Sequence, residues 1–377
     1  MVTVAHAGGS YPVIVEPGVL ERLPELAARY LGGRRTALIT DETVGDLYAR
    51  YLAGANPAWQ SRPRTCSDAS PAGWRERFAF PAGEQSKTRE TWTSLTDRLL
   101  AAGFGRGSAI VALGGGVVGD LAGFVAATLG RGVPWMQVPT TLLAMVDASV
   151  GGKTGVNTAA GKNLVGAFHP PAAVVADPLT LGTLPEADFR GGLAEAVKHG
   201  LIADAGYLEW LAAHASEIAS RDAVLLTELV RRSVAIKARI VSADEREAGE
   251  RAVLNAGHTV AHALEAASTW AIPHGDAVAL GLVAEAALAE RLGIAERGFA
   301  EQVSRALERF GLPTRLAEPL PPGRIVAAMA SDKKGDAEGP RFALIAAPGR
   351  PHRSGDRWTT AAPDAEIVAA LGAIGVE

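Results

Sequence analysis

The chain has 377 residues, of which 48% are hydrophobic and 21% are charged, so it can bury the core of one large or two ordinary domains. Its formal net charge of −4 gives no reason to expect nucleic acid as a partner. Cys66 is the only cysteine, which excludes an intrachain disulfide and is typical of a reducing cytoplasm. The chain does not open with a secretory signal pattern, and no stretch approaches ~18 apolar residues. We therefore expect a cytoplasmic protein without a membrane span.

The first half of the chain alternates short runs typical of strands with amphipathic helical segments. Most candidate strands are bounded by Gly, Pro or Asp, and they are residues 11–15, 36–40, 77–80, 109–113, 135–138 and 174–177. Residues 87–102 are a candidate helix, and the polar, proline-rich residues 53–74 are expected to form a surface loop. The alternation predicts a parallel sheet covered by helices, in which ligands bind beyond the carboxyl ends of the strands.

The second half changes character, because almost every segment from about residue 186 to 310 has apolar residues at helical spacing. The candidate helices are residues 207–216, 223–241, 253–267 and 277–292, and a short strand is expected at 341–345. The change predicts a domain boundary near Pro185. We expect an α/β domain at residues 1–185 and an all-α domain at residues 186–377.

A glycine-rich turn follows the candidate strand at 109–113. Gly114, Gly116 and Gly119 match G-x-G-x-x-G, and a helix can begin at Val117, so backbone N–H groups there could approach a pyrophosphate closely. The acidic residue expected about 20 positions later is missing. A tight strand-to-helix turn without a ligand is therefore an equal alternative.

Three charged residues also follow candidate strands. Glu84 and Lys87 are three positions apart and could face one ligand, and Asp41 is placed where an acidic residue can accept from a ribose hydroxyl. Taken separately, each is better interpreted as a solvated cap or turn residue.

Residues 146–157, V-D-A-S-V-G-G-K-T-G-V-N, match a nucleotide triphosphate loop only at its end. Gly152, Lys153 and Thr154 fit the last positions of G-x-x-x-x-G-K-[ST], but Asp147 stands where the first glycine belongs. A carboxylate there would repel the phosphates, so we reject a nucleoside triphosphatase.

A histidine pair indicates a metal site in the second half. His258 and His262 are i, i+4, which is the usual geometry of a two-histidine metal site, and the alternative is a helix with two polar positions. His274 follows them. Glu195 lies on a helix that is otherwise expected to bury an apolar face, where a carboxylate is costly unless it is paired or bound to a metal. Two histidines and a glutamate, with a coordination position left open, are a catalytic zinc pattern.

Several cations lie among glycine, small or apolar residues. For any single one, a solvated surface charge is the better interpretation. Together with a metal and a dinucleotide, they indicate an anionic, phosphorylated substrate. These cations are Arg131, Lys153, Lys162, Lys198, Lys237, Arg251, Lys333 and Lys334.

These motifs resemble the 3-dehydroquinate synthase family of the sugar phosphate cyclase superfamily. The resemblance is carried, in family order, by P-A-G-E-Q-S-K, G-G-G-V-V-G-D-L-A-G, V-D-A-S-V-G-G-K-T-G-V-N, G-L-A-E-A-V-K-H-G, D-E-R-E, R-A-V-L-N-A-G-H-T-V-A-H-A-L-E, H-G-D-A-V-A-L-G and D-K-K. It implies an N-terminal Rossmann-like NAD-binding α/β domain, a helical metal-binding domain and an active site in the cleft between them. It also implies a homodimer, in which Arg131 reaches the substrate phosphate from a neighbouring subunit.

The resemblance implies a role for each matched residue. Zinc (or cobalt) would be held by Glu195, His258 and His274, whereas His262 would face substrate or take part in proton transfer. The implied catalytic residues are Lys153, His262, Lys198, Asp147 and Lys237. The implied substrate contacts are Arg131, Lys162, Asn163, Arg251, Asn255, Lys333 and Lys334. The implied NAD contacts are Asp41, Glu84, Lys87, Gly114, Gly115, Gly116, Val117, Val118, Gly119, Asp120, Thr140, Thr141, Lys153, Lys162, Thr180, Leu181 and Thr183.

The implied enzyme is a carbon–oxygen lyase of the shikimate pathway of aromatic amino acid biosynthesis. It converts 3-deoxy-D-arabino-heptulosonate 7-phosphate into 3-dehydroquinate and phosphate by transient oxidation with NAD, β-elimination, reduction and intramolecular aldol closure. Arg251 and Asn255 match the family's carboxylate-binding pair, and a guanidinium suits bidentate carboxylate binding. Glu250 departs from the pattern, which has an apolar residue there, and we expect it to face solvent.

Three alternatives stay open. The first is another sugar phosphate cyclase, either an amino-dehydroquinate or a cyclitol synthase. The second is a metal-dependent polyol dehydrogenase, which shares the architecture but needs no anion pocket. The third is an inactive relative that serves as a scaffold, which would have no need of a buried Glu–His–His set.

Overall fold

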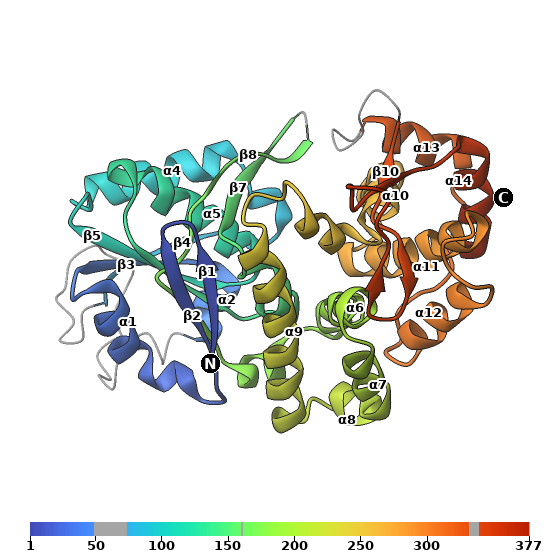
Figure 1. The fold of residues 1–377 in the computed structure, drawn as a ribbon. Coiled ribbons are helices and arrows are strands. Elements are labelled where there is room, and N and C mark those ends of the chain that lie inside the picture. Colours follow the sequence, from blue (N-terminus) through green and yellow to red (C-terminus); the bar gives the residue numbers. More distant parts are fainter. Residues whose placement is uncertain (49–73, 160, 332–338, 377) are drawn as a thin grey trace. The chain divides into compact units, whose positions relative to one another are not determined.

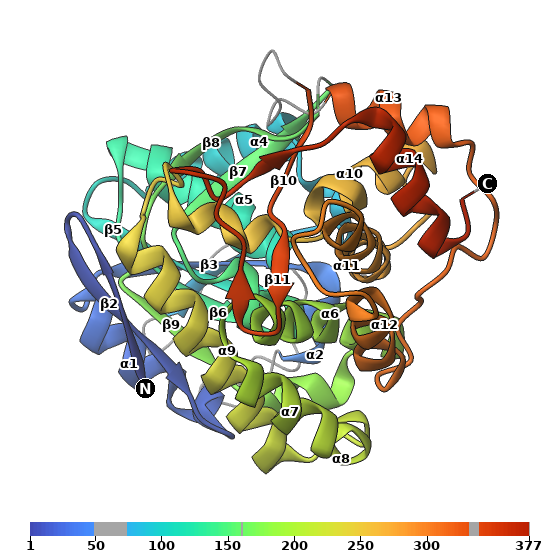
Figure 2. The ribbon, with the colours of Figure 1, turned by 45° about the vertical axis from the view of Figure 1, so that its right-hand side comes forward.

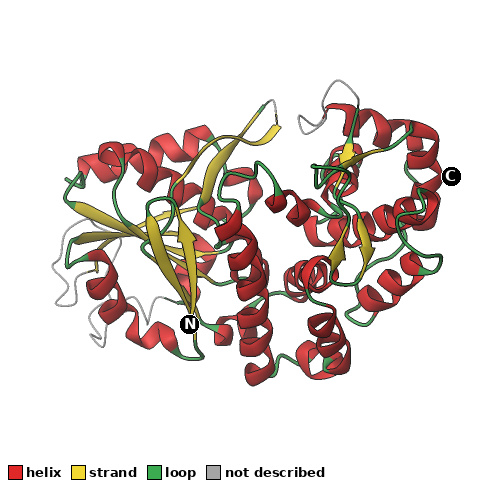
Figure 3. Cartoon of the chain, viewed as in Figure 1, coloured by secondary structure: helices red, strands yellow, loops and turns green. Residues whose placement is uncertain are grey.

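The structure, a computed structural model, describes residues 1–48, 74–159, 161–331 and 339–376. They divide into two compact units, Met1–Leu184 and Pro185–Glu377. The long strands belong to the first unit, and the second is mostly helical (Figure 3). The loop expected at 53–74 lies outside the described residues except for its last position. In the described part of the chain, no helix has the length and apolar character needed to cross a bilayer.

The first unit is built on a seven-stranded sheet with the order β1-β2-β9-β6-β5-β3-β4 (Figure 1). β1 pairs with β2 in antiparallel orientation, and the remaining neighbours are parallel. The strands are β1 (Val2–His6), β2 (Gly9–Val15), β3 (Arg35–Asp41), β4 (Trp74–Phe80), β5 (Ser108–Gly114), β6 (Trp135–Pro139) and β9 (Ala173–Ala176). The six predicted strands are confirmed. β1 was not predicted, because Val4 is its single buried residue and gives little hydrophobic pattern.

Helices cover both faces of this sheet, because its strands are buried on both sides. Along β3, Ile39 belongs to the core beneath α4 (Arg89–Ala101) and α5 (Gly116–Thr128), whereas its neighbour Leu38 belongs to the opposite core. That second core lies beneath the 3₁₀ helix η1 (Val19–Arg22) and α1 (Leu23–Leu31). Strands buried on both faces are typical of parallel sheets, as the apolar runs predicted.

The segments that follow the parallel strands lie at one edge of the sheet. Because β9, β6, β5, β3 and β4 are parallel neighbours, their carboxyl ends point the same way. This edge carries α2 (Glu42–Leu47), the 3₁₀ helix η3 (Glu84–Ser86), the start of α5, the turn after β6 and the 3₁₀ helix η6 (Pro178–Thr183). Most of the predicted NAD contacts are in these segments.

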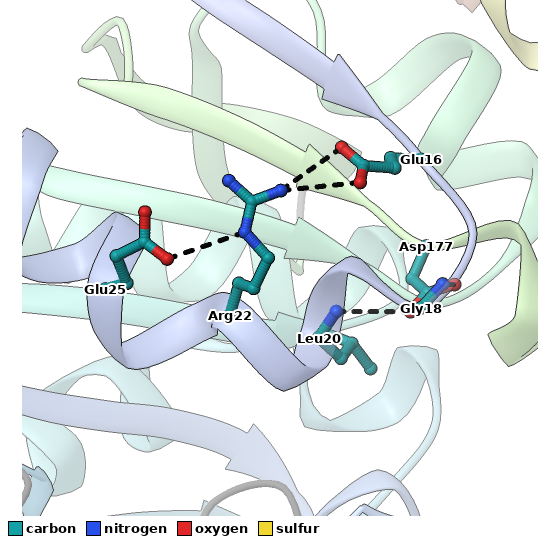
Figure 4. A network of polar contacts seen from close by, with 6 residues as sticks. All are labelled: Glu16, Gly18, Leu20, Arg22, Glu25 and Asp177. Atoms are coloured by element: carbon teal, nitrogen blue, oxygen red, sulfur yellow. Dashed lines mark hydrogen bonds and ion pairs between the residues drawn. The ribbon is translucent and has the colours of Figure 1, made fainter.

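Asp177 fixes the last of these segments. Its buried carboxylate accepts from the N–H groups of Gly18 at 2.9 Å and Leu20 at 3.2 Å (Figure 4). It also accepts from the N–H of Leu179 at 3.0 Å. It therefore caps η6 and η1 together. Arg22 lies beside it on the surface and pairs with Glu16 and Glu25, but exposed ion pairs of this kind contribute little stability.

A two-stranded hairpin that the sequence pattern did not predict follows the π-helical turn η5 (Ala144–Ala148). It consists of β7 (Lys153–Thr158) and β8 (Gly161–Phe168), and Lys153 begins a strand rather than a helix, which agrees with the rejection of a phosphate-binding loop. Gly155 faces Gly166 across the pair, and a Cβ on Gly166 would lie 2.0 Å from the Thr154 carbonyl. Glycine is depleted in strands, so the residues that permit this close approach also hide the hairpin from pattern analysis.

The second unit packs its helices around α11 (His274–Arg291), which is buried on most sides. α10 and α12 lie beside it (Figure 2). Two short ladders, β10 (Arg341–Phe342) with β13 (Thr360–Ala361) and β11 (Ile345–Ala347) with β12 (Arg350–Pro351), complete the otherwise helical unit. The other helices are α6 (Glu186–Ala203), α7 (Ala205–Ala213), α8 (Ala215–Ala219), α9 (Ala223–Ala243), α10 (His258–Ala267), α12 (Phe299–Glu308), α13 (Pro322–Ser331) and α14 (Asp364–Leu371), with the 3₁₀ helices η7 (Glu250–Asn255) and η8 (Gly372–Ile374).

The helix predicted at 253–267 is wrong at its start. Gly257 has a left-handed φ of 80°, so η7 ends before it and α10 begins at His258. A Cβ on Gly281 of α11 would lie 2.0 Å from the Gly257 carbonyl, so the interruption allows close packing. The helix predicted at 207–216 is divided at His214, and the strand predicted at 341–345 is divided between β10 and β11.

Candidate metal and dinucleotide sites

Two glycines bring helices α6 and α11 close together in the second unit. A Cβ on Gly275 would lie 2.1 Å from Gly191 Cα, so position 275 does not accommodate a larger side chain. Glu195 lies one helical turn beyond Gly191, and His274 directly precedes Gly275. The close approach of the two backbones therefore places the Glu195 carboxylate near the His274 ring.

Glu195, His258 and His274 form one group whose candidate ligand atoms all lie within 4.8 Å of one another. His258 Nε2 is 3.4 Å and His274 Nε2 is 3.8 Å from Glu195 Oε1. The other nitrogen of each ring has a partner: His258 Nδ1 lies 3.2 Å from the Ala256 carbonyl, and His274 Nδ1 lies 3.4 Å from Glu265 Oε1. An acceptor at Nδ1 keeps the proton there and leaves the lone pair of Nε2 for a metal.

The electrostatics of the group suit a cation. Glu195 and Lys198 are each 1% exposed and form an ion pair. Burial alone raises the pKa of Glu195, but Lys198 and the histidines outweigh it and hold that pKa well below its ordinary value. Burial and the Lys198 charge lower the pKa of His258 to about 4, so its imidazole is neutral at pH 7, as a metal ligand must be.

The residues present fit a divalent metal. Neither oxygen of Glu195 has a hydrogen-bond partner of good geometry among the described residues, although the carboxylate is fully buried. A buried carboxylate whose oxygens lack well-formed hydrogen bonds, beside two imidazoles that direct Nε2 toward it, is a donor set for zinc or a similar ion. Glu265, which sequence reasoning missed, would orient His274 from behind.

His262 is not a member of this group. It packs edge-on against His258, with ring centroids 5.6 Å apart and an interplanar angle of 88°. The i, i+4 spacing thus selected a partner for His258 that differs from the group in the structure, where the rings of His258 and His274, with centroids also 5.6 Å apart, both direct Nε2 toward Glu195.

Arg251 and Asn255, the predicted substrate contacts that the structure describes in this unit, already have protein partners, and the predicted catalytic residue Lys237 is buried. Lys237 and Arg251 are 6% and 2% exposed. The backbone N–H of Arg251 donates to Asp244 at 3.0 Å, its guanidinium donates to the Glu245 carbonyl, and the side-chain amide of Asn255 donates to Glu247 at 2.5 Å.

Glu250 lies 3.5 Å from Arg239, so its carboxylate forms a surface ion pair there. Lys333 and Lys334 lie outside the described residues.

In the first unit, the glycine turn begins α5. A Cβ on Gly114 would lie 2.4 Å from Val118, and one on Gly119 would lie 2.1 Å from the Gln137 amide. Gly115 closely approaches Thr141, the residue that follows β6. The glycines therefore pack the helix against the sheet while exposing N–H groups at its N-terminus, and this arrangement fits a dinucleotide pyrophosphate.

A polar network connects α5, η3 and the β7–β8 hairpin. The ammonium of Lys87 lies 2.5 Å from both Asp120 Oδ2 and Asn163 Oδ1. Asn157, which sequence reasoning missed, donates from its side chain to Glu84 at 2.7 Å and accepts from the Asn163 N–H at 3.0 Å. Its backbone N–H also donates to the Lys87 carbonyl at 2.8 Å. The structure thus brings together four of the predicted NAD and substrate contacts.

The remaining predicted contacts occupy defined positions. Asp41 caps α2 by accepting from Val44 at 2.8 Å, Thr180 donates to the Asp177 carbonyl at 2.8 Å, and Thr183 is 2.7 Å from the Tyr48 hydroxyl. Arg131 has a φ of 69° between two glycines. The other positions lie at the sheet edge or in the segment after it: Val117, Thr140 and Leu181 at the edge, and Asp147, Lys153 and Lys162 in or beside η5 and the hairpin.

Solved structures define the class to which this fold belongs. 2-deoxy-scyllo-inosose synthase, complexed with carbaglucose-6-phosphate, NAD⁺ and Co²⁺, is 26% identical with a TM-score of 0.87, and the match covers 98% of each chain. 2-epi-5-epi-valiolone synthase from Streptomyces hygroscopicus subsp. jinggangensis 5008, with NAD⁺ and Zn²⁺ bound, is also 26% identical, with a TM-score of 0.83 over 99% of each chain. The fold is that of the sugar phosphate cyclases.

Sequence comparison narrows this class to one family. Residues 77–191 match the family model of the 3-dehydroquinate synthase N-terminal domain, and residues 192–335 match that of the C-terminal domain. The 3-dehydroquinate synthase of Halorhodospira halophila is 47% identical over 328 residues, which are 86% of this chain and 87% of that relative. The chain belongs to the 3-dehydroquinate synthase family.

Proposed function

We propose that this protein converts 3-deoxy-D-arabino-heptulosonate 7-phosphate into 3-dehydroquinate and phosphate, as a lyase that depends on NAD and a divalent metal. The observation that carries the proposal is the meeting of Glu195, His258 and His274 in a chain of this family. Bound NAD would accept and return a hydride, and a bound Zn²⁺ or Co²⁺ would supply Lewis acidity.

The first unit would hold the cofactor at the carboxyl edge of its sheet. The N–H groups that begin α5 would take the pyrophosphate, with no side chain at Gly115 or Gly116 to obstruct it. Asp41 at the end of β3 is placed to accept from a ribose hydroxyl while it caps α2. Lys87, held by Asp120 and Asn163, would present a fixed positive charge at the same edge.

The second unit would hold the metal and the reacting end of the substrate. Glu195, His258 and His274 are the ligands, and Lys198 keeps a positive charge against Glu195. His262, next to His258 but outside the ligand group, would move a proton rather than bind metal. Lys153, Asp147 and Lys237 are proposed as the other catalytic groups.

Arg251 and Asn255 favour a substrate that carries a carboxylate. Arg251 is buried, and the loop before it is folded around the Asp244 carboxylate, which accepts from three backbone N–H groups including that of Arg251. Glu250 does not compete for the guanidinium, because it pairs with Arg239. A positioned guanidinium suits bidentate carboxylate binding, which a cyclitol synthase would not need.

A polyol dehydrogenase would need no such anion contacts. Lys198, Lys237 and Arg251 are all buried, and positive side chains at a site suit an anionic substrate better than an uncharged polyol. These three side chains favour the cyclase over the dehydrogenase. We further propose the homodimer and the cytoplasmic location that the resemblance and the single cysteine predict; sedimentation only at monomer mass would contradict the dimer.

The decisive experiment measures phosphate release from 3-deoxy-D-arabino-heptulosonate 7-phosphate with NAD and Zn²⁺, alongside sedoheptulose 7-phosphate in a parallel tube. We expect release only from the first, with no net NADH accumulation, and loss of release after chelation that added Zn²⁺ or Co²⁺ restores. Release only from the second would assign a cyclitol synthase. Release from neither, with net NADH formed from a polyol, would assign a dehydrogenase.

A further inference from the structure

Glu285 is a buried carboxylate that no step of the proposed function uses. It lies on α11, and the residue is 4% exposed. Its Oε2 accepts from the N–H of Gly257 at 2.7 Å, and its Oε1 accepts from the N–H of Val260 at 3.3 Å. Both donors belong to the start of α10, where a helix has N–H groups without intrahelical partners.

The start of α10 depends on α11 because it has no cap of its own. Gly257 stands at the N-cap, where the side chain of Ser, Thr, Asp or Asn usually accepts from the first turn, and that turn contains no acidic residue. Gly281 of α11 touches the Gly257 carbonyl, and Glu285 lies one helical turn further along. Glu285 supplies both the missing acceptor and the negative charge that a helix N-terminus favours.

The peptide between Ala256 and Gly257 connects Glu285 to His258. Its N–H donates to Glu285, and its carbonyl lies 3.2 Å from His258 Nδ1. Because a peptide unit is planar, the bond that fixes the N–H also fixes the direction of the carbonyl on the other side. That carbonyl holds the proton on Nδ1, so Nε2, 3.4 Å from Glu195 Oε1, keeps its lone pair.

We propose that Glu285 is a positioning residue for His258, acting through this peptide, and the inference rests on the metal site of the proposed function. α10 and α11 each begin with a histidine of the metal group, so Glu285 also ties together the two helices that carry His258 and His274. It sets the metal affinity of the site without touching the metal, as outer partners of ligating histidines do.

The same helix offers a matched control. Glu290 of α11 accepts from the N–H of Ala300 at 2.6 Å, at the start of α12. α12 also follows a left-handed glycine, Gly298, whose φ is 92° and which gives no side-chain cap. None of the three metal-group residues lies on α12. Loss of Glu290 therefore removes an equivalent cap without disturbing a ligand.

The test compares Glu285→Gln, Glu285→Leu and Glu290→Gln with the unchanged protein, each as the metal-free full chain titrated with Zn²⁺ against a chromophoric chelator. We expect the Zn²⁺ dissociation constant to rise about 10- to 100-fold in Glu285→Leu, less in Glu285→Gln, which keeps one acceptor oxygen, and less than about threefold in Glu290→Gln. The visible spectrum of bound Co²⁺ should change in the Glu285 variants and stay the same in Glu290→Gln.

Equal losses of Zn²⁺ affinity in Glu285→Gln and Glu290→Gln would overturn the proposal, because they would reduce Glu285 to a structural cap. An unchanged dissociation constant and Co²⁺ spectrum in both Glu285 variants would overturn it as well. If Glu285→Leu does not fold, the two glutamine variants decide. If the unchanged protein binds neither Zn²⁺ nor Co²⁺, the metal site of the proposed function is wrong, and the role of Glu285 is wrong with it. If the unchanged protein binds metal and only the variants depart from the expected results, the role of Glu285 alone is wrong.

Discussion

The polar groups of the first unit and those of the second are satisfied in opposite ways. In the first, the buried ammonium of Lys87 is shared between Asp120 and Asn163, and Asn157 extends the same network to Glu84. In this network, the charged groups are paired with opposite charges and the donors with acceptors of the protein itself. This network keeps its shape by itself, so it presents a preorganised surface to a ligand.

The second unit assembles its group around a buried carboxylate that is ion-paired with Lys198 but, in the described part of the chain, lacks well-formed hydrogen bonds. Glu195 is fully buried, neither oxygen has a well-formed hydrogen bond among the described residues, and His258 and His274 turn Nε2 atoms toward it. A buried charge is costly unless it is paired and hydrogen-bonded. The first unit therefore owes its ligand specificity to a hydrogen-bonded network that is complete before a ligand binds. The second unit instead directs its incompletely hydrogen-bonded groups toward a cation.

Among the predicted changes, removing a metal ligand of the second unit should have the largest effect on metal affinity and activity. We expect His274→Ala to lose metal affinity by more than the roughly 10- to 100-fold typical of an outer partner, and to lose phosphate release with it. His262→Ala is the matched control: it should retain normal metal content in the purified protein while it loses turnover. Normal metal content in His274→Ala, or loss of metal in His262→Ala, would sink the ligand assignment and restore the i, i+4 pair.

Removing the support behind a ligand should have a smaller effect. Glu265→Gln keeps an acceptor near His274 Nδ1 but removes its charge, so we expect the Zn²⁺ dissociation constant to rise about tenfold, and further in Glu265→Ala. Leu264→Ala truncates a buried apolar neighbour of Glu265 on α10 and controls for lost stability. Chelator competition on the metal-free proteins measures all three. Equal changes in Leu264→Ala and Glu265→Ala would leave Glu265 no specific role.

Most of the fold was predictable from the sequence because each strand or helix leaves its own pattern of apolar and turn residues in a short stretch of chain. Strands buried on both faces leave apolar runs between turn residues, and six of the seven sheet strands were found this way. The hairpin β7–β8 escaped because Gly155 and Gly166 replace the β-branched residues of an ordinary strand. The break at Gly257 also escaped, since a glycine in a helical pattern does not reveal its φ.

The sites were less predictable because they depend on contacts between distant segments. Local spacing joined His258 to His262, and only the family resemblance indicated His274, which the Gly191–Gly275 contact brings next to Glu195. Glu285, like Glu195, is an acid within an apolar helix, so the same sequence pattern could have indicated it. Asn157 gave no such signal, because an amide in a glycine-rich stretch is ordinary.

The smallest expected effect is on NAD affinity, when the hydrogen-bonded network around Lys87 and Asn157 in the first unit is changed. Asn157→Ala removes the side-chain bonds to Glu84 and to the Asn163 N–H, and a net contribution of about 0.5–1.5 kcal/mol for each of the two bonds predicts a rise in the NAD dissociation constant of roughly 5- to 160-fold. The partly exposed position favours the lower end of that range. Zn²⁺ affinity should not change, because the metal group lies entirely in the second unit.

Gln85→Ala is the matched control for this prediction, since Gln85 lies in the same turn as Glu84 and, within the described part of the chain, its side chain hydrogen-bonds only to the Ala82 carbonyl of that turn, at 3.0 Å. Calorimetric titration with NAD measures both variants in the absence of substrate. A weaker NAD complex in Asn157→Ala alone would show that the hairpin must be held against η3 for the cofactor to bind. Equal affinities in the two variants would mean that the Lys87–Asp120–Asn163 contacts hold the hairpin without help, and that the network is more redundant than its geometry indicates.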